Sequence, residues 1–550
     1  MQRIDGEFDY IVVGGGTAGC LLATRLSEDA GTRVCLIEAG GDGRSRAVDI
    51  PAALVMAQRD PELNWRYQSA PQPRLQGRRI GYPRGKGLGG SALINGMVYF
   101  RGHPFDYDDW ATAGATGWSY RELLPYFRRS EHNENFPDSP YHGRSGPMNV
   151  RTVTHPNPLN QVFFDALSSL GVPHSADLNS GDSTGAALRQ LQIRDGVRNT
   201  TAHAMLRPAL GRPNLTVLTQ AHATRVLLDE QRVTGVEAMT PTGLVTVRNR
   251  GEVVLCAGAL QSPQLLLLSG IGDAAELAQA GIMPRHALSG VGRNLQDHLA
   301  SPVHSMTDVA DSYGMSWRAM PRNLLNLAQY AFGRSGPLAN NIFEAAAFVK
   351  TREGLDRPDV QLVFQAAKRP STKVPFPVGH GYAISPVGLY PRSRGRITLS
   401  GPDPLAAPVI DPALLSAPED IEPLIRGIRL ARRVFDSPAF ARYRATETAP
   451  GSARETDDAL ADYIRREAYT VHHPVSTCRM GRDAGAVVDP ALRVIGLEGL
   501  RVADASVFPS IIGGNTNAAV MMVAEKAADL LLGRTPPAPA DIPDLPRTPT

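Results

Sequence analysis

The 550-residue chain has little cysteine, little net charge and no long apolar run, and each shortage excludes a class of protein. None of its four cysteines stands in a C-x-x-C pair, so neither a disulfide framework nor a dithiol redox site is expected. We predict reduced thiols and a cytoplasmic protein. The 57 basic and 54 acidic residues leave a formal net charge of +3, which is too small to indicate a nucleic-acid partner.

Membrane insertion is not indicated either. No uncharged apolar run approaches the roughly 18 residues of a membrane-spanning helix. The first predicted strand begins by Phe8, which leaves no room for a signal peptide. We therefore expect no transmembrane segment, and peripheral association with the inner membrane is left as an alternative. The composition, 42% hydrophobic and 20% charged, is that of a globular protein with two or three domains.

The first 38 residues carry a strand, a glycine turn, a helix and a second strand. Residues 10–13 form an apolar run typical of a strand covered on both faces. Gly14, Gly16 and Gly19 follow with the G-x-G-x-x-G spacing of a dinucleotide-binding turn, where a helix N-terminus offers free N–H groups to a pyrophosphate. Glu38, 19 positions past Gly19, is placed to accept from both ribose hydroxyls. This unit predicts an adenine dinucleotide but does not distinguish NAD from FAD.

A second glycine-rich loop follows. Five glycines fall between Gly81 and Gly90, which is too many for a regular element. Such a loop exposes backbone N–H groups that can bind an anion, and residues 92–98 are predicted to form a helix that starts against it. We therefore predict a second contact with the cofactor here.

The remaining pattern predicts a cofactor domain that a second domain interrupts. Before residue 301 the expected elements are a helix at 110–129, a helix at 160–170, paired strands at 215–218 and 224–228, a hairpin at 235–247, an apolar strand at 253–258 and a helix with Pro263 in its first turn. Between 301 and 469 apolar segments at 342–349 and 361–364 predict a separate sheet with helices. A strand at 500–506 and a closing helix at 518–532 restore the first pattern.

Two adjacent histidines, His472 and His473, stand before Pro474 and shortly ahead of the returning strand. With the earlier motifs they make the chain resemble the glucose-methanol-choline (GMC) family of FAD-dependent oxidoreductases, and among them bacterial choline-dehydrogenase-like and aliphatic alcohol dehydrogenases. The resemblance covers about residues 8–532. Its marks in chain order are the glycine fingerprint with Glu38, the loop 85–91 through Asn95, the segments 258–272 and 292–298, His473 with Pro474, and the run 514–517.

The resemblance implies an α/β fold with a discontinuous Rossmann-like FAD-binding domain and a mixed sheet-and-helix substrate-binding domain. We assign residues 1–158, 195–300 and 470–533 to the first and residues 159–194 and 301–469 to the second. Residues 534–550 carry six prolines and are expected to form a disordered or extended tail.

The resemblance also implies FAD rather than NAD. Some members carry a flavin-linking histidine where this chain has Ile94, so non-covalent FAD is expected. Members commonly have a second hydroxyl residue after Ser91, where this chain has Ala92. The expected contacts with the cofactor are Gly14, Gly16, Thr17, Ala18, Gly19, Glu38, Ala39, Gly89, Gly90, Ser91, Asn95, Gly96, Met97, Val98, Ala223, Ala257, Asp504, Ala505, Asn515 and Thr516.

The family's catalytic pair corresponds to His473 and Asn515. A neutral imidazole with a pKa near 6.5 can take a hydroxyl proton near pH 7, and an amide N–H can donate to the alkoxide that develops. Chemistry alone would also allow His472 as the base and Asn517 as the donor, and the family position favours His473 and Asn515.

The implied reaction is oxidation of a primary alcohol to an aldehyde, with hydride transfer to the flavin and with oxygen or a quinone as electron acceptor. Alternatives on the same fold are a hydroxynitrile lyase, a light-driven fatty-acid decarboxylase and a flavoprotein that uses a pyridine nucleotide. Glu344 is a candidate for attracting a cationic head group, with a structural carboxylate as the competing interpretation. No metal site is expected.

Overall fold

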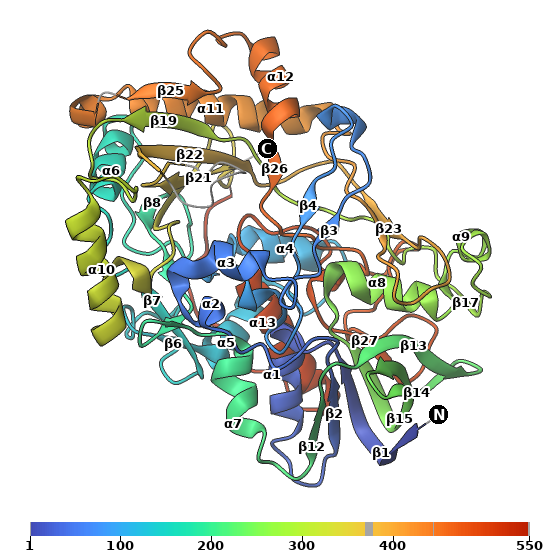
Figure 1. Cartoon of the computed structure of the whole chain (residues 1–550). Coiled ribbons are helices and arrows are strands. Elements are labelled where there is room, and N and C mark those ends of the chain that lie inside the picture. Colours follow the sequence, from blue (N-terminus) through green and yellow to red (C-terminus); the bar gives the residue numbers. More distant parts are fainter. Residues whose placement is uncertain (1, 369–377, 444, 548–550) are drawn as a thin grey trace.

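The computed structural model describes residues 2–368, 378–443 and 445–547. Two large sheets dominate the molecule, a seven-stranded one at the bottom of Figure 1 and an eight-stranded one at the top. Each has its own cluster of buried apolar side chains. In the described residues no helix combines the length and the apolar character needed to cross a bilayer.

The seven-stranded sheet is the dinucleotide-binding sheet that the first 38 residues predict. Its parallel part has the order β12, β2, β1, β15, with β27 as the other neighbour of β15. Because β27 comes from the C-terminal part of the chain, the sheet is discontinuous in sequence. The strands are β1 (Gln2–Val13), β2 (Val34–Ile37), β12 (Leu215–Leu218), β15 (Gly243–Leu255), β27 (Leu500–Val502) and the antiparallel extension β14 (Arg232–Thr240) and β13 (His222–Asp229).

Three helices pack together beside this sheet: α1 (Thr17–Leu26), α5 (Tyr120–Ser130) and α13 (Asn517–Leu531). Buried charge links them, since Arg25 of α1 and Arg129 of α5 both bind Glu525 of α13. Further helices on this half are α2 (Arg46–Asp49), α3 (Leu54–Arg59), α4 (Pro104–Thr112), α7 (Arg207–Ala209), α8 (Gly258–Leu268) and α9 (Ala274–Gln279).

The eight-stranded sheet is antiparallel throughout. Its strands are β8 (Gly185–Leu188), β18 (Leu299–Ala300), β19 (Val303–Thr307), β20 (Ala345–Val349), β21 (Val360–Gln365), β22 (His380–Gly388), β25 (Thr446–Ala449) and β26 (Tyr469–Thr470). Helix α11 (Glu422–Phe435) covers it with the buried side chains of Leu424, Ile428 and Ala431, which repeat at helical spacing. Helices α6 (Leu159–Ser169), α10 (Met320–Gly333) and α12 (Asp457–Glu467) complete this half (Figure 1).

Smaller sheets lie outside the two large ones. A four-stranded sheet contains β5 (Val98–Tyr99), β6 (Glu131–Asn133), β7 (Met148–Thr152) and β9 (Gln190–Leu191). Two-stranded sheets join β3 (Tyr67–Gln68) to β4 (Gly81–Tyr82), β10 (Ile193–Arg194) to β11 (Val197–Arg198), β16 (Ile271–Gly272) to β17 (His286–Ala287), and β23 (Arg396–Thr398) to β24 (Val409–Asp411).

Several sequence predictions are confirmed. The hairpin at 235–247 is β14 with the start of β15, the helix at 160–170 is α6, and the closing helix is α13. The segments at 342–349 and 361–364 contain β20 and β21, which are neighbours in the second sheet.

The predicted pairing of residues 215–218 with 224–228 is wrong. Strand β12 pairs with β2, whereas β13 pairs with β14 on the far side of the sheet. The connection between them donates backbone N–H groups from Gln220 and Ala221 to the carbonyls of Gly40 and Glu38. It therefore passes over the strand ends and does not turn back as a hairpin.

Three helix predictions also need correction. The helix at 110–129 is divided into α4 and α5, because Gly114 and Gly117 take positive φ and Ser119 forms a capping box with Glu122 that starts α5. Residues 92–98 form no α-helix, since a 3₁₀ turn (Gly90–Leu93) leads to β5.

Helix α8 begins at Gly258, so Pro263 is its sixth residue and lies outside the first turn. The carbonyl of Ala259, which Pro263 has no N–H to satisfy, accepts the Thr477 hydroxyl at 2.6 Å instead.

The proline-rich tail is extended and lies against the body. Its described part, up to Arg547, contains no helix or strand. The N–H of Ala540 donates to the carbonyl of Arg121 at 2.8 Å, Ile542 is buried, and the Arg547 guanidinium lies over the Phe105 ring. The extended alternative is therefore correct for residues 534–547.

Candidate active site

A cavity of about 600 Å³ lies between the two large sheets. Its wall includes Val13 at the end of β1 on one side and Val387 of β22 on the other. One end is formed by the glycine loops after β1 and β4, and His473 and Asn515 lie in the same wall. The cavity size is in the range of cofactor and small-molecule sites.

The glycine turn after β1 is built to receive a pyrophosphate. Gly14 has φ +103°, and a Cβ on Gly19 would lie 1.8 Å from the Gly14 carbonyl oxygen, so only glycine fits where α1 packs on the turn. A Cβ on Gly16 would meet no atom nearer than 3.9 Å, because this position faces the cavity. No side chain caps the N-terminus of α1, so its first backbone N–H groups are free to bind an anion. These features fit the diphosphate of FAD.

Glu38 contacts both glycine loops. Its Oε1 accepts from the N–H groups of Gly40 at 2.8 Å and Gly87 at 2.9 Å, and its Oε2 accepts from Gly15 at 2.7 Å. A carboxylate has about four acceptor positions, so this arrangement leaves roughly one for a ribose hydroxyl. The sequence predicted that Glu38 accepts from both ribose hydroxyls, and it therefore missed the main partners of this side chain, which are the three backbone N–H groups.

The second glycine loop packs directly on the first. The N–H of Gly89 donates to the Gly15 carbonyl at 2.7 Å, and a Cβ on Gly90 would lie 2.6 Å from the Gly16 Cα. The glycines of this loop are thus required for close backbone approach.

Most of the predicted cofactor residues line the cavity. The exceptions are Gly19 and Gly89, which shape the two loops from behind. Asp504 lies in the wall, but its carboxylate accepts from the Gly258 N–H, the Ser262 hydroxyl and the Ser506 N–H. The side chain therefore fixes the start of α8.

His473 stands between two side chains that the fold brings together from distant segments. Its Nδ1 lies 3.0 Å from Nδ1 of His298, and its Nε2 lies 3.1 Å from Nδ2 of Asn515. Nε2 of His298 lies 2.9 Å from the carbonyl oxygen of Leu389. The backbone N–H of His473 donates to Oδ1 of Asp297 at 2.8 Å.

These partners assign the proton positions on both rings. A carbonyl oxygen only accepts, so Nε2 of His298 carries the hydrogen that Leu389 receives. In a neutral imidazole Nδ1 of His298 then has the lone pair and accepts from Nδ1–H of His473. The lone pair of His473 is consequently on Nε2, which lies at the cavity and accepts from Nδ2 of Asn515.

The electrostatic surroundings keep both rings neutral. Burial lowers the pKa of His298 to about 4. Burial lowers the pKa of His473 well below 6.5, and the nearby imidazoles and arginines lower it further because they disfavour a second positive charge beside them. The value near 6.5 expected from the sequence is therefore too high. Burial also raises the pKa of Asp297 to about 6, against the hydrogen bonds that its carboxylate accepts.

The two rival residues have other surroundings. Asn517 uses its amide fully, because its Oδ1 accepts the Thr17 hydroxyl and its Nδ2 donates to Gln192. His472 lies in the cavity wall with positive φ, and its buried Nδ1 finds no hydrogen-bond partner in the described part of the chain. Among the described residues, neither His472 nor Asn517 takes part in the hydrogen bond that joins His473 to Asn515.

Three residues near the site had no role assigned from the sequence. His298 and Asp297 belong to the motif 292–298, which marked the family resemblance but had no function assigned. The motif ends just before β18, where both residues contact His473. Arg189 also lines the cavity, and its Nε and Nη2 are buried without hydrogen-bond partners among the described residues. No local sequence pattern indicates a role for Arg189.

Glu344 is buried and binds the Asn157 N–H, Asn160 and Tyr313, so the structural interpretation of this carboxylate is correct.

The parallel sheet, the glycine cradle and the histidine at the cavity wall together define a dinucleotide-binding oxidoreductase. The GMC oxidoreductase family profile matches residues 8–300 and 391–524, and the chain belongs to this family. The protein is therefore an FAD-binding flavoprotein that oxidises CH–OH donors.

Similar proteins match over nearly the whole chain. An alcohol dehydrogenase (acceptor) of Pseudomonas putida is 41% identical over 536 residues, with 97% of each chain covered. An oxygen-dependent choline dehydrogenase of Sinorhizobium fredii is 40% identical over 538 residues, with 96% of each covered. The solved structure of pyridoxine 4-oxidase from Mesorbium loti superimposes with a TM-score of 0.87 at 34% identity, covering 96% of this chain and 100% of that one. A formate oxidase structure gives a TM-score of 0.89 at 26% identity, with 96% and 99% covered.

Proposed function

We propose that the protein oxidises an uncharged primary alcohol to an aldehyde, with His473 as the base for the hydroxyl proton and Asn515 as the hydrogen-bond donor to the alkoxide. The observation that carries the proposal is the 3.1 Å contact between Nε2 of His473 and Nδ2 of Asn515 at the cavity wall. A substrate hydroxyl that lies beside both groups in the cavity, in place of their direct hydrogen bond, would donate to Nε2 and accept from the amide.

His298 holds the base in the useful tautomer. Because Nδ1–H of His473 donates to His298, the proton of the alcohol arrives on Nε2. The imidazolium formed then donates on both sides, through Nδ1 to His298 and through Nε2 to the alkoxide. Bound FAD supplies the acceptor for the hydride that leaves the alcohol carbon.

The charges around the cavity support an uncharged substrate. Among the described residues the lining carboxylates are Glu38 and Asp504, and both are bonded to backbone N–H groups at the dinucleotide end. Arg189 and Lys368 lie in the wall, and Glu344 does not. A quaternary ammonium group like that of choline would find no free counter-charge among these lining residues, so we expect choline to be a poorer substrate than a neutral alcohol.

We further propose non-covalent FAD and a quinone-like electron acceptor. Ile94 lies in the cavity wall where a linking histidine would be needed, and its side chain has no atom that forms such a bond. The choice of an acceptor other than oxygen rests on the word acceptor in the name of the Pseudomonas putida relative, whereas the name of the Sinorhizobium fredii relative gives oxygen. The four cysteines are buried and free, which supports a cytoplasmic location.

Anaerobic mixing of the holoenzyme with a panel of substrates tests this proposal. Straight-chain and aromatic primary alcohols should bleach the flavin and yield one aldehyde per FAD, whereas choline should bleach it more slowly. A cyanohydrin cleaved without bleaching would establish the lyase alternative. Acid precipitation should release the yellow colour into solution, and colour left in the washed pellet would contradict non-covalent FAD. Turnover with oxygen equal to that with a quinone would overturn the acceptor assignment.

A further inference from the structure

Helix α10 is attached to the body of the protein by its polar face. The Arg322 guanidinium donates to the carbonyls of Ala310, Asp311 and Ser312, and the Asn323 amide donates to the carbonyl of Gly314. About two turns further, the Tyr330 hydroxyl donates to the carbonyl of Gly196. A surface helix of a globular protein normally does the opposite, with its apolar face packed inward.

The apolar face of α10 is consequently exposed. No residue of the helix is buried. The side chains at positions 320, 324, 327 and 331 follow the spacing of one helical face, and positions 325 and 332 widen it. The exposed fractions are 51% for Met320, 59% for Leu324, 57% for Leu325, 57% for Leu327 and 94% for Phe332.

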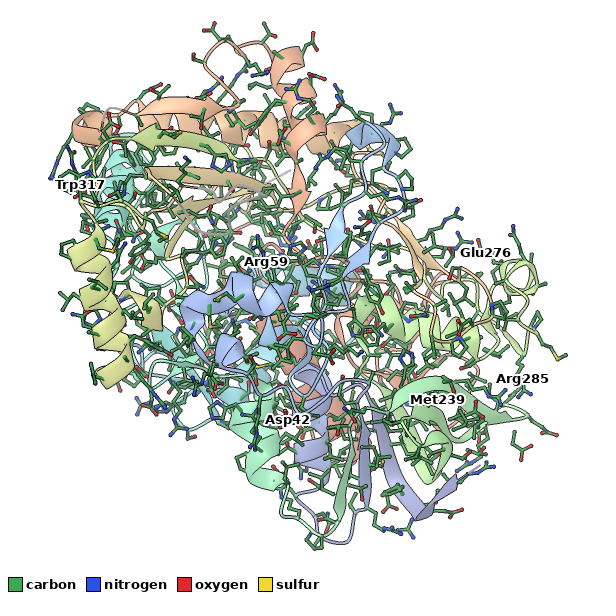
Figure 2. The ribbon with its side chains drawn as sticks, viewed as in Figure 1. Asp42, Arg59, Met239, Glu276, Arg285 and Trp317 are labelled. Atoms are coloured by element: carbon green, nitrogen blue, oxygen red, sulfur yellow. The ribbon has the colours of Figure 1, made fainter. Side chains whose placement is uncertain are left out.

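Trp317 extends this surface just before the helix. It is 79% exposed and projects at the outer edge of the molecule in Figure 2, on the side where Figure 1 shows α10. Met315 is 47% exposed two residues earlier. A contiguous group of large apolar side chains at this exposure marks an interaction surface. We call residues 315–334 the α10 surface.

The charge of the α10 surface has one sign. From residue 312 to residue 343 the chain contains no aspartate or glutamate and three arginines. Arg322 points inward, which leaves Arg318 and Arg334 exposed at the two ends of the helix. The Arg318 guanidinium lies 5.3 Å from the centroid of the Trp317 ring. Cationic ends, an interfacial tryptophan and an apolar face are the features of a helix that lies in a membrane surface.

We propose that the α10 surface docks the protein on a membrane that contains anionic phospholipids. Its 14 residues are about 21 Å long, which is too short to cross a bilayer and suits a helix lying parallel to it. Arg318 and Arg334 would contact anionic head groups while the apolar face enters the acyl boundary.

A second copy of the chain fits this surface less well. A two-fold contact places the same surface on both partners, so the arginines of the two helices would approach one another. The segment from 312 to 343 contains no carboxylate that could pair with these arginines across such a contact. Anionic lipid satisfies the apolar face and the arginines together.

Docking in this way would bring the site near the lipid. After α10 the chain runs through a 3₁₀ turn (Pro337–Ala339) to Ile342 and Phe343, which line the cavity. A quinone dissolved in the membrane would therefore be close to the electron donor. The docking itself stands on α10 alone and does not depend on the proposed reaction.

Flotation of the holoenzyme with lipid vesicles tests the proposal. The protein should float with vesicles of phosphatidylcholine and phosphatidylglycerol in equal amounts, and less with phosphatidylcholine alone. A variant with Leu324→Gln, Leu327→Gln and Phe332→Gln should bind at least about tenfold more weakly, because three apolar side chains no longer enter the bilayer. Arg318→Gln with Arg334→Gln should lose about fivefold per residue on the anionic vesicles and little on the neutral ones.

Met283→Gln is the matched control, because Met283 is 78% exposed on a loop far from α10 in the chain and should not change flotation. Every variant is first checked for wild-type FAD content and for turnover of a water-soluble alcohol. Wild-type protein that stays with the vesicle-free fraction, or a triple variant that floats as well as wild type, would overturn the proposal. The proposal would also be overturned if light scattering showed a dimer for the wild type and a monomer for the triple variant. A protein that floats but oxidises no alcohol would leave the docking intact and refute the proposed reaction.

Discussion

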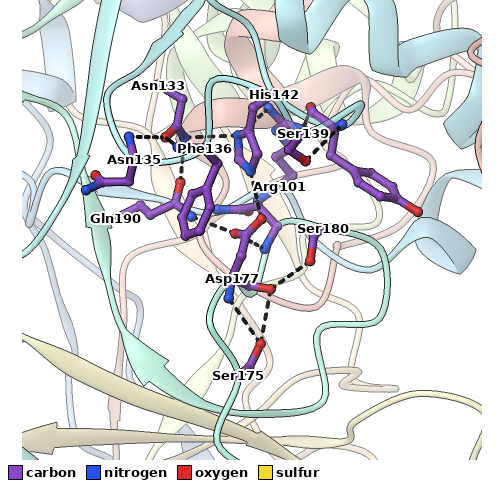
Figure 3. A network of polar contacts seen from close by, with 12 residues as sticks. Arg101, Asn133, Asn135, Phe136, Ser139, His142, Ser175, Asp177, Ser180 and Gln190 are labelled. Atoms are coloured by element: carbon purple, nitrogen blue, oxygen red, sulfur yellow. Dashed lines mark hydrogen bonds and ion pairs between the residues drawn. The ribbon is translucent and has the colours of Figure 1, made fainter.

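Two buried histidines, His142 and His473, show how neighbours decide the charge of the same side chain. Nδ1 of His142 lies 2.9 Å from Oε1 of Glu131. Its Nε2 lies 2.8 Å from Oδ2 of Asp177, as Figure 3 shows. A carboxylate only accepts, so both nitrogens of His142 must carry hydrogen. The two nitrogens of His473 face an imidazole and an amide, and one of them keeps its lone pair.

The difference appears in the pKa values. Burial lowers the pKa of both rings, but Asp177 and Glu131 outweigh it and raise the pKa of His142 above 6.5. Among the residues that the structure describes, no carboxylate bonds to the ring of His473, and its pKa falls well below 6.5. His142 is thus held as a cation below its raised pKa and balances a buried cluster with Arg101, whereas the ring of His473 is neutral, as the proposed base must be. Burial alone would have predicted the same behaviour for both.

Removing the neutral base should have the largest effect. His473→Ala should retain FAD but reduce it with alcohol about 10²–10⁴-fold more slowly, the usual contribution of a general base. His472→Ala is the control, since among the described residues the hydrogen bond of Asn515 goes to His473 and not to His472. Stopped-flow measurement of anaerobic flavin reduction compares them, and the wild-type rate should be independent of pH at and above pH 6.5 because the pKa of His473 lies lower. A crippled His472→Ala beside a near-normal His473→Ala would show that the base is the wrong residue.

Removing the cationic histidine should instead affect stability. His142→Gln leaves Glu131 and Asp177 buried with only part of their positive partners, which should cost about 3–5 kcal/mol in the free energy of unfolding. Denaturant unfolding of the holoenzyme, followed by far-ultraviolet circular dichroism, measures it.

His132→Gln is the matched control for this stability effect, because His132 is exposed and should shift stability by less than about 0.5 kcal/mol. Flavin reduction in the folded His142→Gln protein should keep the wild-type rate. Equal stability of the two variants would mean that the cluster does not need its imidazolium.

The sequence was sufficient for the features that local pattern determines. The glycine fingerprint, the hairpin of β14 and β15 and helix α13 follow from spacing and periodicity. The partner of β12 did not, because an apolar strand carries no information about which distant strand lies beside it. Likewise periodicity shows that α10 has an apolar face but not that this face points outward.

The candidate site shows the same limit. Motif positions were enough to select His473 and Asn515, which the fold places in contact. The role of His298 required the register that brings β18 beside β26, and with it the hydrogen bond between the two imidazoles. The state of His142 required knowing that two carboxylates from separate loops meet one ring.

Changing the partner of His473 tests whether the tautomer matters. His298→Leu removes the acceptor of Nδ1–H, so the ring can rotate or exchange tautomers, and flavin reduction should slow roughly 10–10²-fold. His298→Gln keeps a carbonyl oxygen that can accept from Nδ1–H and should recover most of the rate. FAD content and the KM for alcohol should change little in either variant. Equal rates in the two variants would reduce His298 to a packing residue.

The smallest expected effect is the pH dependence of stability that His142 contributes. Its pKa in the folded protein is raised above the ordinary 6.5, so the ion cluster stabilises the fold fully below pH 6.5 and loses this contribution as the pH rises through the folded pKa. The loss should amount to about 1.4 kcal/mol for each unit by which the pKa is raised. Other groups also titrate in this range. Subtracting the unfolding free energy of His142→Gln from that of wild type at each pH isolates the contribution of His142. The difference between the two unfolding free energies should therefore shrink from pH 6.5 upward and stay level below it. A difference that grew with pH would mean that His142 is neutral in the folded protein, and the contrast with His473 would disappear.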